Sequence, residues 1–402
     1  MKKSKSIIFI LVFFCICTSV HLRAQYTFFN PEGAFAIEVS LPNTDLIRLP
    51  IYRNSMASLA VVGDYIIGGT SAVEGTNPFV FSASLSNRCM TSLFDLGEAI
   101  PGQQKIPTGF CKGNNGELYA GTMANDTDPE IQTGGHLFQA TVDQKGGIYI
   151  KDLGIPVPGE GILALTMGTC KSMLFGITHP SGLFFTFNLE TGKVKQYEDI
   201  APSAEDLKVM KSYALSPMDF LCKALIADDQ GNIYGSALVN RLFYFDPDEE
   251  RFHFLGDNLP EVWGRRTMGV VESWTKSEDN LLYGGNAGDG QLFELNPATK
   301  KVKNLGKPIM MNRLRGLTTA KDGKIYGIAG AAPGYAHLFS YDEKNGFEDL
   351  GNPEFVMKAP GIEQGINWRA FQLSSIASSE DGRYIVMGED ESLSQLLIFP
   401  TY

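Results

Sequence analysis

The sequence contains few of the residues from which metal and redox sites are built. Its 402 residues include five His and six Cys, and no C-x-x-C motif or pair of His or Cys stands at zinc-ligand spacing. This excludes a zinc site, and we expect no cofactor. Four cysteines lie beyond the N-terminal region, namely Cys89, Cys111, Cys170 and Cys222. Since Cys170 and Cys222 stand in apolar stretches, we expect small buried side chains rather than disulfide partners.

Calcium ligands are also incomplete. Asn125, Asp126, Asp128 and Glu130 form an acidic cluster that lacks the glycine and the distal glutamate of a twelve-residue calcium loop. We interpret the cluster as a solvated loop, with calcium binding as the alternative.

Positive charge is scarce. Lys and Arg number 34 against 45 Asp and Glu, which gives a formal net charge of −11. Nucleic-acid binding is excluded at this charge, because the neutralisation of phosphates requires a basic face. Long apolar runs are missing after residue 25, so we expect no membrane span.

Residues 1–25 have the pattern of a secretory signal peptide. Lys2, Lys3 and Lys5 precede the apolar run from Ile7 to Val20, and the small Ala24 follows near a suitable cleavage point. The run is shorter than the roughly 20 residues of a membrane anchor, which favours export to the periplasm or beyond. Cleavage would remove four positive charges and no carboxylate, changing the formal net charge from −11 to −15.

A repeated pattern dominates the rest of the chain. Apolar segments that end in a glycine-rich loop recur seven times, roughly 43 to 60 residues apart, which is the period of propeller blades. The seven segments are GDYIIGGT (63–70), GELYAGT (116–122), SMLFGIT (172–178), GNIYGSA (231–237), NLLYGGN (280–286), GKIYGIA (323–329) and GRYIVMG (382–388).

Three further strands are expected around each copy. An apolar segment precedes it, a strand that carries Leu-Phe in five copies follows it, and a short segment such as FDLG (94–97) or NLG (304–306) ends the unit. The strands alternate with period two, and turns rich in Asp, Asn, Pro and Gly separate them. Seven such sheets around an axis cover both faces of every sheet. We therefore predict an all-β, seven-bladed propeller of four-stranded antiparallel blades over residues 26–402.

The last unit lacks its outer strand, which we expect from YTFFNPEGAFAIEVS (26–40), so that the ring closes without a free edge. The same arrangement explains Gly285, Gly288 and Gly290, whose G-x-x-G-x-G spacing resembles a phosphate loop. These glycines lie between two predicted strands, with no helix N-terminus behind them. A nucleotide site is therefore excluded.

Units of the form IYG…LFxYDPxTGKVxxLG resemble those of secreted seven-bladed propellers of the YncE, streptogramin-lyase and gluconolactonase-like type, many of them from gut bacteria that degrade polysaccharides. The resemblance covers nearly the whole chain after residue 25, but its motifs are architectural. The Asp-box of sialidases, the WD dipeptide and the kelch double glycine do not recur. The resemblance implies an exported propeller that acts on or binds glycans. We expect a monomer.

Cations concentrate in the loops that lead into the innermost strands. We expect these loops, with those that join the second and third strands, to share one face around the central channel. Arginine can bind the carboxylate of a uronic acid with paired donors, and a neighbouring Trp can stack on a sugar ring. The candidate substrate-binding residues are Arg53, Lys105, Trp263, Arg265, Arg313, Arg315, Trp368 and Arg369. The alternative is that each Arg bridges to an acid of the neighbouring blade.

Three residues are candidates for catalysis. A lyase removes the proton beside a neutralised uronate carboxylate, which would assign the base to His179 or Tyr335 and the neutralising role to Arg266. Glu160 and Asp219 would instead be the two carboxylates of a glycoside hydrolase. We predict a lyase for an anionic, uronate-containing carbohydrate. The first alternative is a non-catalytic propeller that binds a carbohydrate or a protein, and the second is the hydrolase.

Two further features have structural interpretations. The segment 201–216 is expected to form a helix capped by Ser203, as a lid or as a prop between blades. His136 and His337 directly precede Leu-Phe strands, so we expect them to make structural hydrogen bonds.

Overall fold

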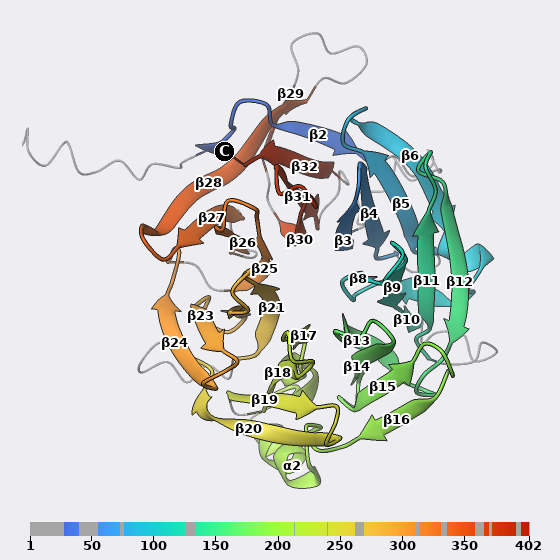
Figure 1. Ribbon diagram of the computed structural model, residues 1–402, viewed down its shortest axis with the longest axis vertical. Coiled ribbons are helices and arrows are strands. Elements are labelled where there is room, and N and C mark those ends of the chain that lie inside the picture. Colours follow the sequence, from blue (N-terminus) through green and yellow to red (C-terminus); the bar gives the residue numbers. More distant parts are fainter. Residues whose placement is uncertain are drawn as a thin grey trace, which may run out of the picture.

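The computed structural model describes residues 28–39, 55–72, 76–124, 134–212, 214–238, 240–261, 269–310, 313–330, 336–357, 366–369, 372–390 and 395–401. Their strands form seven sheets that are arranged as blades around a central axis, together with one separate two-stranded sheet (Figure 1). The chain is a seven-bladed β-propeller, as the repeat predicts. Among the described residues, no helix is long and apolar enough to cross a membrane.

The first four blades follow one another along the chain, each running from its innermost to its outermost strand. Blade one contains β3 (Met56–Val62), β4 (Tyr65–Thr70), β5 (Phe79–Ser84) and β6 (Cys89–Asp95). Blade two contains β8 (Cys111–Lys112), β9 (Leu118–Gly121), β11 (Leu137–Val142) and β12 (Ile148–Gly154). Blade three contains β13 (Gly161–Met167), β14 (Met173–His179), β15 (Phe184–Asn188) and β16 (Val194–Tyr197). Blade four contains β17 (Ile226–Ala227), β18 (Ile233–Ala237), β19 (Arg241–Asp246) and β20 (Arg251–Asn258).

Blade six carries two additional strands, and blade seven takes its outer strand from the N-terminal segment. Blade five contains β21 (Val271–Lys276), β22 (Leu282–Asn286), β23 (Leu292–Asn296) and β24 (Lys301–Gly306). Blade six contains β25 (Leu314–Thr319), β26 (Ile325–Ala329), β27 (His337–Asp342) and the long β28 (Gly346–Met357), to which β1 (Phe28–Phe29) and β29 (Ile366–Arg369) are added. Blade seven contains β30 (Leu373–Ser378), β31 (Tyr384–Glu389), β32 (Gln395–Pro400) and β2 (Phe35–Glu38).

The repeated Gly and Phe of the sequence face each other across the second and third strands of a blade. In blade five, Gly284 is paired with Phe293, and a Cβ at Gly284 would lie 2.3 Å from the Phe293 Cζ atom. The same pairing joins Gly68 to Phe81, Gly176 to Phe185, Gly235 to Phe243 and Gly327 to Phe339. Glycine recurs there because the ring of the next strand occupies the space of its side chain.

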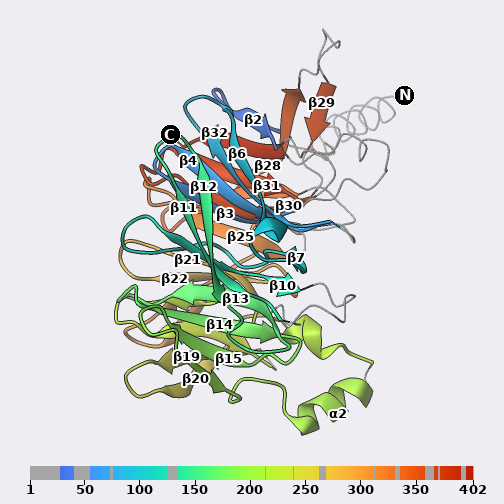
Figure 2. The same cartoon turned by 90° about the vertical axis from the view of Figure 1, so that its right-hand side faces the viewer.

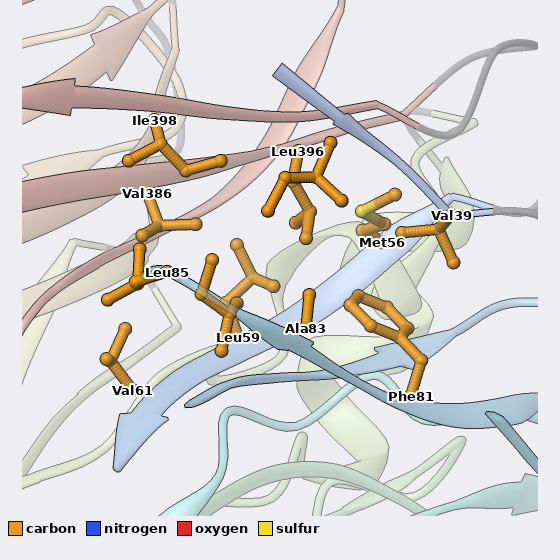
Figure 3. Packing of buried hydrophobic residues seen from close by; sticks show 12 residues of the cluster. Val39, Met56, Leu59, Val61, Phe81, Ala83, Leu85, Val386, Leu396 and Ile398 are labelled. Carbon is orange, nitrogen blue, oxygen red and sulfur yellow. The ribbon is translucent and has the colours of Figure 1, made fainter. Parts of the chain in front are cut away.

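Seven clusters of buried apolar residues hold the blades together, one at each boundary between neighbouring blades. The cluster between blades seven and one closes the ring (Figure 3). There, Ile37 and Val39 of the N-terminal segment pack with Leu396 and Ile398 of β32 and with Phe81 of blade one. The expected closure by the N-terminal strand is confirmed, since β2 pairs antiparallel with β32.

Extra elements gather at one face of the disc. Figure 2 shows β7 (Gln103–Lys105), β10 (Met123–Ala124), β29 and helix α2 (Ala204–Ser212) projecting from the same side. Short 3-10 helices lie at Leu96–Glu98 and Pro217–Phe220. Ser203 caps α2 as expected: its hydroxyl accepts a hydrogen bond from the Asp206 amide at 3.1 Å, and the Asp206 carboxylate accepts from the Ser203 amide at 2.9 Å.

The cysteine expectation is correct for Cys222 and wrong for Cys170. Cys111 and Cys222 are buried, and all four described cysteines are free thiols. Cys170 is exposed because it lies in the turn between β13 and β14 rather than in either strand. The two histidines act structurally as expected. His136 Nδ1 is 2.9 Å from Asp152 Oδ1, and His337 Nδ1 is 3.0 Å from Asp349 Oδ1.

The glycine-rich segment of blade five is a strand and a turn. Gly285 lies within β22, and Gly288 and Gly290 lie in the turn that leads to β23. Gly290 has a φ of 78°, a left-handed conformation that suits glycine in a tight turn. No helix follows these glycines in the described chain, so the site for a pyrophosphate that a helix N-terminus would supply is missing.

Candidate functional site at the mouth of the central channel

A cavity of about 460 Å³ lies at the axis, where the innermost strands begin. Each blade contributes three consecutive residues to its wall. These triplets are Ala57–Leu59, Pro107–Gly109, Leu163–Leu165, Lys223–Leu225, Glu272–Trp274, Arg315–Leu317 and Ser374–Ile376. Segments far apart in the sequence therefore converge on one site, at the face that the repeat predicts.

A β-bulge marks the start of the inner strand in five blades. In blade six, Leu314 pairs with Ala329 and Gly316 pairs with Ile328, so the register passes over Arg315. The register passes over Ala57, Leu163, Glu272 and Ser374 in the same way. All five are the first residues of their triplets. A bulge redirects a side chain relative to the pleat, and here it accompanies the side chains that form the rim of the cavity.

Charge is distributed unevenly around this rim. Among the first residues of the triplets, those of blades four, five and six are charged (Lys223, Glu272 and Arg315), whereas those of the other four blades are uncharged. With Lys105, Arg313 and Asp390, the cavity is lined by four cations and two carboxylates, although the whole chain carries a formal net charge of −11. Net positive charge in a wall of this kind favours an anionic ligand.

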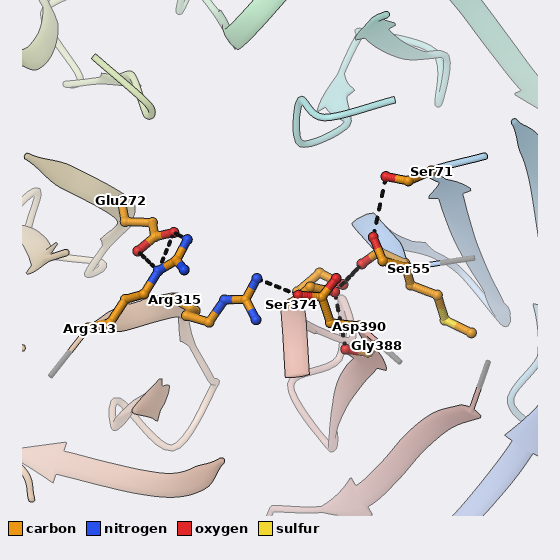
Figure 4. A network of polar contacts seen from close by, with 10 residues as sticks. Ser55, Ser71, Glu272, Arg313, Arg315, Ser374, Gly388 and Asp390 are labelled. Carbon is orange, nitrogen blue, oxygen red and sulfur yellow. Dashed lines mark hydrogen bonds and ion pairs between the residues drawn. The ribbon is translucent and has the colours of Figure 1, made fainter. Parts of the chain in front are cut away.

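Two ion pairs cross blade boundaries at the rim (Figure 4). The Arg313 Nε atom of blade six lies 2.9 and 2.7 Å from the two carboxylate oxygens of Glu272 in blade five, and these hydrogen bonds raise the pKa of Arg313. The Arg315 guanidinium donates to Asp390 Oδ2 of blade seven at 2.5 Å. Both predicted arginines thus line the cavity and also bridge to an acid of a neighbouring blade.

Two lysines of the cavity lie in a different electrostatic environment. In the described part of the chain, neither Lys105 nor Lys223 has an ion pair with a carboxylate. Lys105 is held in place by its backbone: it pairs with Met123 of β10 and forms a bridge with Ser71, which follows β4. Burial lowers the pKa of Lys105. The fold therefore fixes a partly desolvated ammonium group beside the cavity.

A second cavity, of about 270 Å³, adjoins Lys105. Its wall includes His179, the last residue of β14, together with Met123, Pro180 and Met218. Lys105 belongs to the walls of both cavities. The predicted base and one predicted cation are thus brought to one pocket, beside the channel rather than inside it.

The remaining predicted residues lie elsewhere or outside the described chain. Glu160 accepts hydrogen bonds from the amide and the hydroxyl of Ser181, so the following loop occupies its carboxylate. Asp219 is exposed in the 3-10 helix at 217–220. Arg369 Nε is 3.8 Å from Glu354 Oε2 across the β28–β29 hairpin, which also carries Trp368. Outside the described residues lie Arg53, Trp263, Arg265, Arg266, Tyr335 and the acidic cluster at 125–130.

The sequence pattern did not point to four residues of the site: Lys223, Glu272, Trp274 and Asp390. A signal for the first three was present, because each holds a fixed place in a triplet that begins just after a buried apolar residue, which is Cys222 in blade four and Val271 in blade five. Period-two alternation does not show which of these side chains face the channel, because a β-bulge changes which residues of the strand point to each side.

Comparison with known proteins bears on the fold. No protein-family description and no curated protein matches the chain. Among solved structures, a streptogramin B lyase is 12% identical, with a TM-score of 0.59 over 92% of this chain and 98% of its own. A catalytically inactive virginiamycin B lyase from Staphylococcus aureus with quinupristin is 10% identical, with a TM-score of 0.60 over 92% of this chain and 100% of its own.

A third similar structure is the extracellular domain of a protein from B. thetaiotaomicron described as a hybrid two-component system. It is 13% identical, with a TM-score of 0.53 over 92% of this chain and 40% of its own. These likenesses establish the propeller fold alone. At such identities, neither the activity of the lyases nor the role of the extracellular domain extends to this chain.

Proposed function

We propose that the protein binds an anionic carbohydrate, such as a uronate oligosaccharide, at the mouth of its central channel. The supporting observation is the pair Lys105 and Lys223, two cations of the cavity wall that lack a carboxylate partner in the described residues. A carboxylate ligand would supply the missing negative charge to both. Such charge-assisted contacts are stronger than neutral hydrogen bonds.

Other groups of the cavity suit the rest of a sugar. Hydroxyl groups of Ser55 and Ser71 line the same wall and can exchange hydrogen bonds with sugar hydroxyls, whereas the Ser374 hydroxyl donates to the Met56 carbonyl and can only accept from a ligand. The Ser55 hydroxyl donates to the Ser71 hydroxyl at 3.3 Å, a long contact that a ligand hydroxyl could replace. The expected signal peptide at residues 1–25 would place this site outside the cytoplasm, where such oligosaccharides occur.

Calorimetric titration tests the binding proposal. We expect trigalacturonate to bind and neutral maltotriose to bind at least tenfold more weakly. Lys105→Met and Lys223→Met should each weaken trigalacturonate binding about tenfold or more, in line with roughly 1.5–3 kcal/mol for a hydrogen bond to a charged group. Lys151→Met is the matched control, because Lys151 is exposed on the outer strand β12. Equal affinity for the two sugars would contradict the proposal.

Elimination in the adjoining pocket is the second candidate, and one observation favours it: Lys105 and His179 line that pocket together. In this reaction His179 would take the C5 proton of the uronate. The electron pair forms the C4–C5 double bond, the C4–O glycosidic bond breaks, and the leaving oxygen takes a proton. Cations at the carboxylate stabilise the negative charge that develops there. In this proposal Arg266 would neutralise the carboxylate, and Tyr335 is the alternative base.

Ultraviolet absorbance separates the two candidates, because the new double bond is conjugated with the carboxylate. Turnover that His179→Ala abolishes, with trigalacturonate binding retained, would support the lyase. Binding without any rise in absorbance would leave the non-catalytic propeller as the function.

A further inference from the structure

The wall of the central channel changes character with depth. The first residue of each triplet forms the partly charged rim, whereas the third residues are apolar in six of the seven blades. These third residues are Leu59, Leu165, Leu225, Trp274, Leu317 and Ile376, with Gly109 in blade two. In the five blades whose triplets lie within the inner strand, the third residue lies up to roughly 6–7 Å along the strand from the first.

Part of the apolar ring is accessible from the cavity. Trp274 and Ile376 are partly exposed, whereas the four leucines of the ring are at most 8% exposed and pack mainly in the clusters between blades. The ring also has a gap, because a Cβ placed at Gly109 would meet no atom within 4 Å. Apolar surface that water can reach beneath a cationic rim favours a ligand with an apolar group, because binding would remove that surface from water.

We propose that the channel takes a carboxylate with an apolar substituent, an aryl or short alkyl group, and that it binds with the apolar end first. This inference rests on the proposed anion binding at the rim and extends it to a second class of anionic ligand. The carboxylate would remain at Lys105 and Lys223 while the apolar group descends to the leucine ring. In a ligand of this class, the distance from the carboxylate to the apolar group is similar to the distance from the charged rim to the apolar ring.

The open position at Gly109 provides a variant that should fold. Gly109 has no positive φ and no neighbour within 4 Å of a Cβ, so Gly109→Leu adds an apolar side chain where space exists. That side chain would complete the ring and occupy the floor of the channel. Gly256→Leu is the matched control, since Gly256 lies on the outer strand β20 and also has open space around a Cβ.

Titration with 4-phenylbutyrate and with butyrate tests the inference. We expect 4-phenylbutyrate to bind about tenfold or more tightly, because burial of a phenyl group contributes roughly 1.5–3 kcal/mol. Gly109→Leu should remove this advantage and leave butyrate binding in place, Gly256→Leu should change neither, and Lys223→Met should weaken both acids.

Each other outcome has a distinct meaning. Equal affinity for the two acids, or an advantage that survives in Gly109→Leu, would overturn the inference while trigalacturonate binding still supported the proposed function. If neither acid nor trigalacturonate bound, the proposed function would fail and the inference would fail with it.

Discussion

Arg313 of blade six and Glu272 of blade five are joined across a blade boundary, with the Arg313 Nε atom within 2.9 Å of both carboxylate oxygens. The Glu272 side chain is 12% exposed and the Arg313 side chain 37% exposed, so the guanidinium is the more accessible partner. Arg313 has a φ of 72°, an uncommon conformation for a residue with a side chain. The contact links two blades and neutralises a cation at the rim.

Release of that cation should strengthen anion binding. In Glu272→Gln the shape is kept and the negative charge removed, so we expect several-fold tighter binding of trigalacturonate. The variant should also lose roughly 1–2 kcal/mol of unfolding free energy, because Arg313 loses its charged partner. Calorimetry and thermal denaturation measure the two effects. Glu278→Gln, in an exposed turn of the same blade, is the control. Unchanged affinity would mean that Arg313 does not meet the ligand.

Lys105→Met should stabilise the protein while impairing its binding. A partly buried ammonium group without a carboxylate is costly to desolvate, and a side chain of similar length without charge avoids this cost. We expect a higher melting temperature, corresponding to about 1 kcal/mol, together with weaker trigalacturonate binding. Lys151→Met should shift neither quantity. A lower melting temperature for Lys105→Met would show that the ammonium contributes to folding.

The pH dependence of binding follows from the same lysine. Burial lowers the pKa of Lys105 below the ordinary lysine value of 10.5, so this ammonium loses its proton at a lower pH than exposed lysines do. Only the protonated form attracts a carboxylate. Trigalacturonate affinity should therefore fall as pH rises through the pKa of Lys105, and Lys105→Met should flatten that part of the curve. Titrations between about pH 7 and 10 measure it. An identical slope in the variant would disprove the assignment.

The Gly and Phe of the repeat should behave as one unit. Gly284→Ala would place a Cβ 2.3 Å from the Phe293 ring, so we expect a loss of about 1–3 kcal/mol of unfolding free energy from overpacking. Combination with Phe293→Leu should cost less than the sum of the two single changes, because the smaller side chain makes room. A double-mutant cycle from denaturant unfolding gives the coupling. Strict additivity would contradict the space-filling explanation.

Closure of the ring by the N-terminal strand can be tested at one residue. Ile37 of β2 is 3% exposed in the cluster between blades seven and one, so Ile37→Ala should cost about 2–4 kcal/mol of unfolding free energy. Glu38→Ala, the next residue and exposed, should change stability little. Denaturant unfolding measures the free energy of unfolding of both variants. A mild effect at Ile37 would mean that blade seven is stable without its N-terminal strand.

The blade repeat could be recognised in the sequence because each copy forms the same strands and turns from the same local pattern of residues. Tyr-Gly, Leu-Phe and the Asp-rich turns are local patterns, and each corresponds to a strand or turn of the structure. The missing outer strand could also be inferred, since a ring with a free edge would be exposed to pairing. Burial of Cys170 was predicted wrongly because an apolar stretch does not show where its turn lies.

The sequence by itself determined the number of blades, the order of the strands and the closure, because these depend on short-range periodicity and on burial of both faces of each sheet. Only the tertiary structure decided which cations are paired. Arg313 meets Glu272 and Arg315 meets Asp390 across blade boundaries, while Lys105 and Lys223 have no carboxylate partner among the described residues. Such contacts join residues tens of positions apart, and their geometry depends on bulges at the starts of the inner strands, which local periodicity does not encode.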